Sequence, residues 1–521
     1  MSSSVRDSRM LQGFGWSTMY LVVTRASALV AVPVVLHDVG PDLYAVWVLA
    51  GALVMIQSLF DLGVASAVVR YVAHAASAKG GARASVLIIA RRAMYFYLLL
   101  SAAVFLPMWF YAKDLVGLVN FLKPDEVAAA VVIVRWAAVA FVLTNIVMVA
   151  ASVLQGINRV GASYRDQTIG WLLYLPLLVV GMSVVPHAQA LGIAWVGAYT
   201  VQMLLLLRSL IVGMRSVPPG FSDTPGIGEM LAFGSRWQVS AWADFATFQL
   251  PRIIAGVALS SSDVVSLDVA IRAALFVVAP LFAFYPTVLP KAASLLARDG
   301  EQALRAFLQP YYSIGLSLVV VGVSVFIPVE VPALAAWTGR ETGTFDPLVV
   351  AVILIGTAAY ASTGLLSSAQ LARGEITPIL IYKGRQLLLA VVLLPLAALL
   401  GLLPVAVALS VSLFLPAIAF NLRTAKELGL GTPLRSRRTR WSLAGFALMQ
   451  VAIPMTLVLS VGDALPSWQL LGLVSLAALT CLLIGGFLLV GRVRARDYWS
   501  GLAPWRTAAA PASIADHLAR K

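Results

Sequence analysis

Seven charged side chains interrupt stretches of the chain that are otherwise apolar. They are Arg25, Arg135, Arg252, Arg272, Asp61, Asp244 and Asp268. Placing such a charge near the centre of a bilayer costs at least about 2.5–3.5 kcal/mol, so each should face a protein interior or a water-filled cavity. A guanidinium group presents a planar fork of N–H donors that matches a phosphate group. Arginines in this setting are therefore candidates for an anion-binding site.

Arg25 lies in the middle of the first apolar stretch, residues 16–36. At a rise of 1.5 Å per residue, its side chain would have to span about 13 Å to leave the bilayer, which is too far for an arginine. Two interpretations stay open. Arg25 is either an anion-binding group in a central cavity or one half of a structural ion pair with an acid on another span.

The aspartates are candidate partners of the arginines. Asp61 follows Gln57 by four residues, so the two share a helix face. Asp61 is a candidate partner of Arg25, a proton-sensitive acid, or a polar packing contact within Asp61-Leu62-Gly63. Asp244 lies in the most polar span, residues 230–256, which must line a cavity or a lobe interface. It precedes Arg252 by about two helical turns and so lies on a similar face.

Two further arginines have simpler explanations. Arg272 follows Asp268 by four residues, so this pair can neutralise itself locally. Arg135 lies in the outer third of its span, from which it can reach the lipid headgroups. The four histidines are scattered and Cys481 is the one cysteine, so the sequence predicts no catalytic set, metal cluster or intrachain disulfide.

The elements that carry these residues are membrane-spanning helices. Of the 521 residues, 60% are apolar and 12% are charged, which is far from the composition of soluble domains. Fourteen spans are predicted, at residues 16–36, 43–68, 86–111, 127–153, 164–185, 190–212, 230–256, 264–289, 306–329, 347–370, 379–400, 403–422, 441–461 and 467–490. The eleventh and twelfth are separated only by a predicted tight turn at Gly401 and Pro404.

Lysines and arginines alternate between the connections. Thirty lie at the termini or in the even-numbered connections, Lys383 and Arg385 among them, against three in the odd-numbered ones. The odd-numbered connections carry acids instead, including Glu330. Cytoplasmic loops are enriched in Lys and Arg, so both termini are predicted to be cytoplasmic. The net charge of +14 is assigned to topology and anionic lipid rather than to nucleic acid.

A weak internal repeat indicates a two-lobed body. Residues 40–80 align with residues 261–300 without gaps through Lys291, which matches Arg70. The period of six spans implies a parallel repeat about an axis along the membrane normal. The expected domains are an N-lobe at 1–215, a C-lobe at 216–430, two additional spans within 431–491, and a disordered cytoplasmic tail at 492–521.

Several motifs resemble bacterial polysaccharide and O-antigen flippases, which move lipid-linked oligosaccharides and belong to the multidrug/oligosaccharidyl-lipid/polysaccharide exporter superfamily. They are Thr24-Arg25, Pro33, Gly40-Pro41-Asp42-Leu43-Tyr44-Ala45-Val46-Trp47, Asp61-Leu62-Gly63-Val64-Ala65-Ser66-Ala67, Arg70, and Leu154-Gln155-Gly156 with Arg159. The resemblance implies two six-helix lobes around a central cavity lined by spans one, two, seven and eight, with two further helices outside.

The resemblance also implies a cargo, an oligosaccharide unit on a polyprenyl diphosphate, moved across the bacterial cytoplasmic (inner) membrane by alternating access. Arg25 matches the position of a diphosphate-binding cation, and Arg252 and Arg272 match less closely. The predicted substrate-binding set is Arg25, Arg252, Arg272, Asp61, Asp244 and Gln57. No cofactor is expected, and coupling to a proton or Na⁺ gradient stays unassigned. Expected partners are membrane lipid and the polysaccharide-synthesis machinery, with the chain itself a monomer.

Three alternatives remain from the sequence. An ion-coupled exporter of drugs or small molecules would share the architecture, but the arginines favour an anionic cargo. A membrane polysaccharide polymerase or glycosyltransferase usually needs a larger outer loop than residues 110–126 or 330–346 provide. A structural scaffold would leave Arg25 unexplained.

Overall fold

The computed structural model describes residues 3–77, 83–221, 224–339, 345–431 and 466–492, together with 448, 451–453, 456 and 460. Its described helices are α1 (Ser3–Val54), α2 (Gln57–Phe60), α3 (Val64–Ser77), α4 (Arg83–Phe110), α5 (Ala112–Gly117), α6 (Val127–Gly156), α7 (Val160–Val184), α8 (His187–Met214), α9 (Ile227–Phe248), α10 (Leu250–Ala258), α11 (Ser261–Val277), α12 (Ala279–Thr338), α13 (Pro347–Ser362), α14 (Gly364–Ala372), α15 (Thr377–Ala398), α16 (Leu402–Glu427) and α18 (Ser467–Arg492). Across these residues no strand is present.

Eight of the described helical segments are long and apolar enough to cross a membrane. Helices suit this environment because they satisfy every backbone polar group internally. The chain is therefore a multi-pass membrane protein. The count of fourteen crossings and the cytoplasmic placement of both termini stay predictions. Most of the thirteenth predicted span, 441–461, and the predicted tail beyond Arg492 lie outside the described residues.

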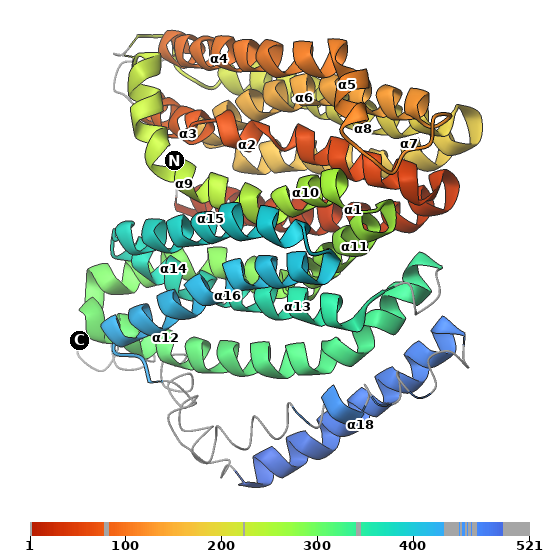
Figure 1. Cartoon of the computed structure of the whole chain (residues 1–521). Coiled ribbons are helices and arrows are strands. Elements are labelled where there is room, and N and C mark those ends of the chain that lie inside the picture. Colours follow the sequence, from red (N-terminus) through yellow and green to blue (C-terminus); the bar gives the residue numbers. More distant parts are fainter. Residues whose placement is uncertain are drawn as a thin grey trace, which may run out of the picture. The chain divides into compact units, whose positions relative to one another are not determined.

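The first predicted span and the first part of the second lie in α1, which folds back at Gly40. At 1.5 Å per residue the 52 residues of α1 would extend about 78 Å, far more than one crossing requires. Gly40 has φ 77°, a left-handed conformation that glycine adopts without steric cost. Figure 1 shows the red ribbon of α1 turning back at its far end. Residues before and after Gly40 can therefore line one cavity.

The second span is broken twice, where the sequence predicts an unbroken helix over 43–68. The helix is interrupted at Met55-Ile56 and again at Asp61-Leu62-Gly63, where Leu62 and Gly63 both have positive φ. The carbonyls of Ser58 and Leu59 accept hydrogen bonds from Gln238 Nε2 of α9, at 2.8 and 2.9 Å. Gly63 packs directly on the backbone of Gly234, leaving no room for a Cβ at either position.

Two other predicted boundaries can be compared with the helices. The turn between the eleventh and twelfth spans is confirmed, because α15 ends at Ala398, α16 begins at Leu402, and Gly401 has φ 108°. The predicted connection between the eighth and ninth spans is confirmed as a turn but is shorter than the sequence indicates, because α12 comprises two helices that meet at Gly300, where φ is 77°. The eighth span is interrupted at Val278, two residues before Pro280.

The chain divides into two compact units. The first unit contains residues 1–276, 337–339 and 380–416, and the second contains residues 277–336, 340–379 and 417–521. The first is centred on α6, which has a buried face along most of its length and packs against α1, α3, α4 and α8. The lobe boundaries predicted at 215/216 and 430/431 stay predictions.

The second unit is held by polar contacts between its helices. Asn421 Nδ2 of α16 donates to Ser362 Oγ at 2.7 Å, and Tyr285 donates to the carbonyl of Ala361. Glu330, assigned to an outer loop from the sequence, lies inside α12 and is buried. Neither of its carboxylate oxygens has a hydrogen-bond partner among the described residues. Its neighbour Val329 packs against Leu470 and Val474 of α18.

Candidate functional site

Three arginines of the predicted site line one cavity of about 360 Å³ in the first unit. We call it the arginine cavity. Arg25 enters from the first leg of α1, Arg252 from α10 and Arg272 from α11. The second leg of α1 supplies Trp47, Val48, Gly51 and Ala52, so the fold-back at Gly40 brings both legs of α1 to the same space. Among the described residues that line this cavity there is no carboxylate.

A buried carboxylate fixes two of the arginines from behind. Asp268 is fully buried; its Oδ1 accepts from Arg252 Nε and its Oδ2 from Arg272 Nε, each at 2.6 Å. Tyr44 completes the arrangement by donating its hydroxyl to Oδ2 at 2.6 Å. A buried carboxylate with three donors is well satisfied, so both guanidinium groups are held in fixed orientations. The local pairing of Asp268 with Arg272 expected from the sequence is confirmed, and Arg252 is added to it.

The two clamped arginines have different freedom to bind a ligand. Arg252 is buried, and its Nη1 donates to the carbonyl of Phe248 and, at 3.3 Å, to Gln249 Oε1. Arg272 is partly exposed and lies over the ring of Trp47, 5.5 Å from its centroid. Arg252 is therefore a positioning residue, whereas Arg272 and the exposed Arg25 face the cavity.

The cavity carries an excess of positive charge. Three arginines line it and a single acid, Asp268, lies behind two of them, which leaves two positive charges among these four groups. Trp47 also lines the cavity, and its buried Nε1 has no hydrogen-bond partner among the described residues. The Trp47 ring is held against Trp195 at a centroid distance of 5.8 Å. This lining suits a ligand with several anionic oxygens.

Gln57 and Asp61 lie in a second cavity of the same unit, of about 490 Å³. We call it the amide cavity because four glutamines line it: Gln57, Gln155, Gln167 and Gln202. The predicted common face of Gln57 and Asp61 is confirmed, although α2 ends at Phe60, just before Asp61. Asp61 accepts hydrogen bonds from the Tyr97 hydroxyl and, at 3.3 Å, from the backbone N–H of Ala65. Met55 lines both cavities, so they adjoin there.

Asp244 is positioned differently from the sequence-based expectation. It accepts a hydrogen bond of 2.6 Å from Lys383 Nζ of α15 and is not part of the lining of the arginine cavity. Lys383 was assigned to a cytoplasmic connection, but it lies inside α15 and is buried. Lys383 lies four residues from the predicted start of its span and was counted with the preceding loop, so its pairing with Asp244 was not predicted. Arg135 is exposed and lies over the Trp109 ring, 5.6 Å from its centroid.

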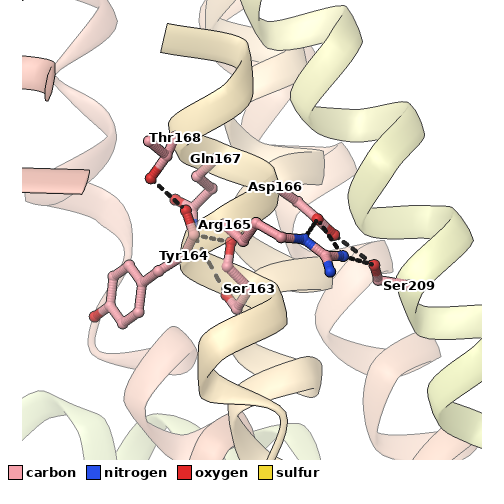
Figure 2. Close-up of polar contacts among 7 residues, drawn as sticks. All are labelled: Ser163, Tyr164, Arg165, Asp166, Gln167, Thr168 and Ser209. Atoms are coloured by element: carbon pink, nitrogen blue, oxygen red, sulfur yellow. Dashed lines mark hydrogen bonds and ion pairs between the residues drawn. The ribbon is translucent and has the colours of Figure 1, made fainter. Parts of the chain in front are cut away.

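One buried acid was not predicted from the sequence. Asp166 of α7 is only 1% exposed and accepts from the adjacent Arg165 at 2.8 Å and from Ser209 of α8 at 2.5 Å. Figure 2 shows Arg165 and Asp166 directed toward Ser209, with Tyr164 on the opposite side of the helix. Asp166 follows an arginine at the start of a predicted span, so it was grouped with the charged residues of the preceding loop. The contact joins α7 to α8, and neither Asp166 nor Ser209 lines the arginine cavity or the amide cavity.

No group of three or more His, Cys, Asp or Glu side chains within the described part of the chain is arranged to hold a metal ion.

No family model and no curated protein sequence matches the chain. Solved structures do. The lipid II flippase MurJ, in an inward closed conformation, superimposes with a TM-score of 0.68 over 92% of this chain and 98% of that chain, at 12% identity. The chain has the fold of that flippase.

Two transporters of another kind share the fold less closely. The MATE multidrug transporter DinF-BH in complex with R6G has a TM-score of 0.57 over 83% of this chain and 98% of that chain, at 13% identity. An inward-facing multidrug resistance MATE family transporter of the MOP superfamily has a TM-score of 0.55 over 79% and 94%, at 15% identity. At these identities the likeness concerns the fold alone.

Proposed function

We propose that the protein is a flippase for a lipid-linked oligosaccharide on a polyprenyl diphosphate, with the diphosphate held in the arginine cavity. The observation that supports it is the convergence of Arg25, Arg252 and Arg272 on one cavity with a net excess of positive charge. The cargo class follows from the sequence resemblance to polysaccharide and O-antigen flippases. The fold shared with a lipid II flippase is compatible with it.

The physical requirement is to carry a diphosphate through a bilayer. A bare diphosphate cannot enter hydrocarbon, because burying an unpaired charge is prohibitively costly. Arg25, Arg272 and the Trp47 indole N–H supply donors for its oxygens, and Asp268 keeps the Arg272 fork in place before the ligand arrives. The polyprenyl tail can stay in the lipid while the head group occupies the cavity. Alternating access of the two lobes is the proposed means of transfer.

The same cavity argues against a cationic drug as cargo, because three arginines line it and like charges repel. The proposal places the protein in a bacterial cytoplasmic membrane, as part of polysaccharide synthesis, with transport and no covalent chemistry. Coupling to a proton or Na⁺ gradient is part of the same proposal and is not assigned to a residue.

The test is a flipping assay in proteoliposomes with a fluorescent polyprenyl diphosphate sugar, comparing Arg25→Gln with Arg135→Gln. Both arginines are exposed, but only Arg25 lines the arginine cavity. A hydrogen bond to a charged group contributes about 1.5–3 kcal/mol, or about 10- to 100-fold in affinity. We expect Arg25→Gln to slow flipping by about tenfold or more at limiting substrate and Arg135→Gln to leave it unchanged. Equal rates in both variants would contradict the proposal.

A further inference from the structure

The amide cavity has a lining unlike that of the arginine cavity beside it. Four glutamines, four Ser or Thr residues and four aromatic residues contribute to it, and its one ionisable acid, Asp61, is already hydrogen-bonded to Tyr97 and Ala65. No arginine or lysine is among the described residues that line it. The cavity therefore offers no cation to a phosphate, but it offers many groups to a neutral polar ligand.

Two of the four glutamines lack a protein partner for their amide N–H₂ groups. Gln57 is 4% exposed and Gln202 is 1% exposed, and neither Nε2 atom has a hydrogen-bond partner among the described residues. The other two are satisfied, because Gln155 Nε2 donates to Ser163 Oγ at 3.4 Å and Gln167 Nε2 to the Ser163 carbonyl at 3.1 Å. Buried donors without acceptors are unfavourable, and both side chains line the cavity, so a ligand oxygen that reached either amide N–H₂ group would relieve that cost.

The neighbouring residues fix Gln202 in position. Gly170 of α7 faces it so closely that a Cβ at this position would collide with the Gln202 side chain. Aromatic rings complete the wall: Trp171 lies edge-on to Tyr199, with centroids 5.8 Å apart, and Tyr20 lies 5.6 Å from Tyr164. Flat apolar rings beside amide and hydroxyl groups match a ligand with apolar C–H faces and equatorial oxygens.

We propose that the amide cavity is the subsite for a neutral sugar residue of the cargo, most favourably one whose ring and acetamido oxygens accept from Gln57 and Gln202. This inference rests on the proposed function, because it takes the sugar to be attached to the diphosphate in the arginine cavity. The two cavities adjoin at Met55, so one head group can occupy both. The charged part is bound by the arginines and the uncharged part by the amides.

The test compares two probes, a polyprenyl diphosphate without sugar and the same lipid carrying one N-acetylglucosamine. Binding to purified full-length protein in nanodiscs is measured for wild type, Gln57→Leu and Gln202→Leu. Gln386→Leu is the matched control, because Gln386 is a buried glutamine that donates to Thr247 and lines neither cavity. Gln202→Glu keeps the size of the side chain but removes the donor, which separates loss of hydrogen bonding from altered packing.

In wild type the lipid that carries the sugar should bind more tightly than the lipid without it. Each substitution at Gln57 or Gln202 should lower the affinity for the sugar-bearing lipid by about three- to tenfold, the effect of one lost hydrogen bond. Binding of the sugar-free lipid should change less than about twofold, and Gln386→Leu should change neither. If the sugar adds nothing, or the glutamine variants weaken both lipids equally, the cavity holds only water and the inference is overturned. If wild type binds neither lipid, the proposed function itself fails.

Discussion

The two cavities of the first unit share the lining residue Met55 but differ in their polar groups, because one is lined by charged side chains and the other mainly by neutral ones. In the arginine cavity, charge is abundant, and a buried acid with three donors holds two of the three arginines in place. In the amide cavity, charge is scarce, and two buried amide donors have no acceptor among the described residues. The first arrangement suits an anion, whereas the second suits a neutral ligand with acceptor oxygens. In this proposal the arginine cavity binds the diphosphate of the cargo and the amide cavity binds its sugar.

The strongest test of this contrast is on stability. Asp268→Asn leaves the buried Arg252 and the partly exposed Arg272 as like charges that share no carboxylate. Removing one partner of a buried ion pair costs about 3–5 kcal/mol, so thermal unfolding in detergent should occur at a much lower temperature. Asp61→Asn is the matched change in the amide cavity, and it should cost about 1 kcal/mol, because an amide oxygen still accepts from Tyr97. Equal losses would show that the two cavities do not differ as described.

The next effect concerns ligand affinity. Arg25→Gln combined with Arg272→Gln lowers the formal charge of the arginine cavity by two and removes both of the guanidinium groups that face it. Two lost charge-assisted hydrogen bonds should weaken binding of a sugar-free polyprenyl diphosphate by about 100-fold or more. The measurement is a titration in nanodiscs at two salt concentrations, with Arg135→Gln as the control. An unchanged affinity in the double variant would show that the arginine cavity is not the anion-binding site.

The smallest expected effect lies outside both cavities. Ser209→Ala removes the hydroxyl that donates to buried Asp166, a contact shown in Figure 2. A hydrogen bond to a charged group contributes about 1.5 kcal/mol or somewhat more, so the melting temperature should fall slightly. Binding of the sugar-bearing and sugar-free lipids should be the same as in wild type. A selective loss of either lipid would mean that the α7–α8 contact belongs to the binding site.

The sequence predicts the cations of the site better than their partners. Arg25 stood out because it lies too deep in its span to reach the surface, and Asp268–Arg272 stood out because of its i,i+4 spacing. The ion pair between Arg252 and Asp268 could not be predicted, because Arg252 lies on a separate short helix, α10, sixteen residues before Asp268. Lys383 was misassigned for a different reason: a charge near a span end is counted for topology whether or not it is buried.

Helix interruptions were the other limit. An apolar run carries a signal for helix but little signal for a break, so the break at Met55-Ile56 was not predicted. Pro280, Pro286 and Pro290 indicate a bend in the eighth span, and the helix breaks at Val278, two residues before the first of them. In the predicted repeat of 40–80 on 261–300, the two breaks fall within two residues of equivalent positions. Gly40 and Gly401, by contrast, lie where a turn must occur between two spans, and both have positive φ.

The central claim is that a diphosphate is bound between Arg25 and Arg272, and a cryo-EM structure with a polyprenyl diphosphate N-acetylglucosamine tests it most directly. The account predicts diphosphate density within hydrogen-bond distance of both guanidinium groups and the Trp47 indole N–H, with the sugar on the Met55 side. A bound lipid whose diphosphate lies away from Arg25 and Arg272, with the arginine cavity empty of it, would contradict the account.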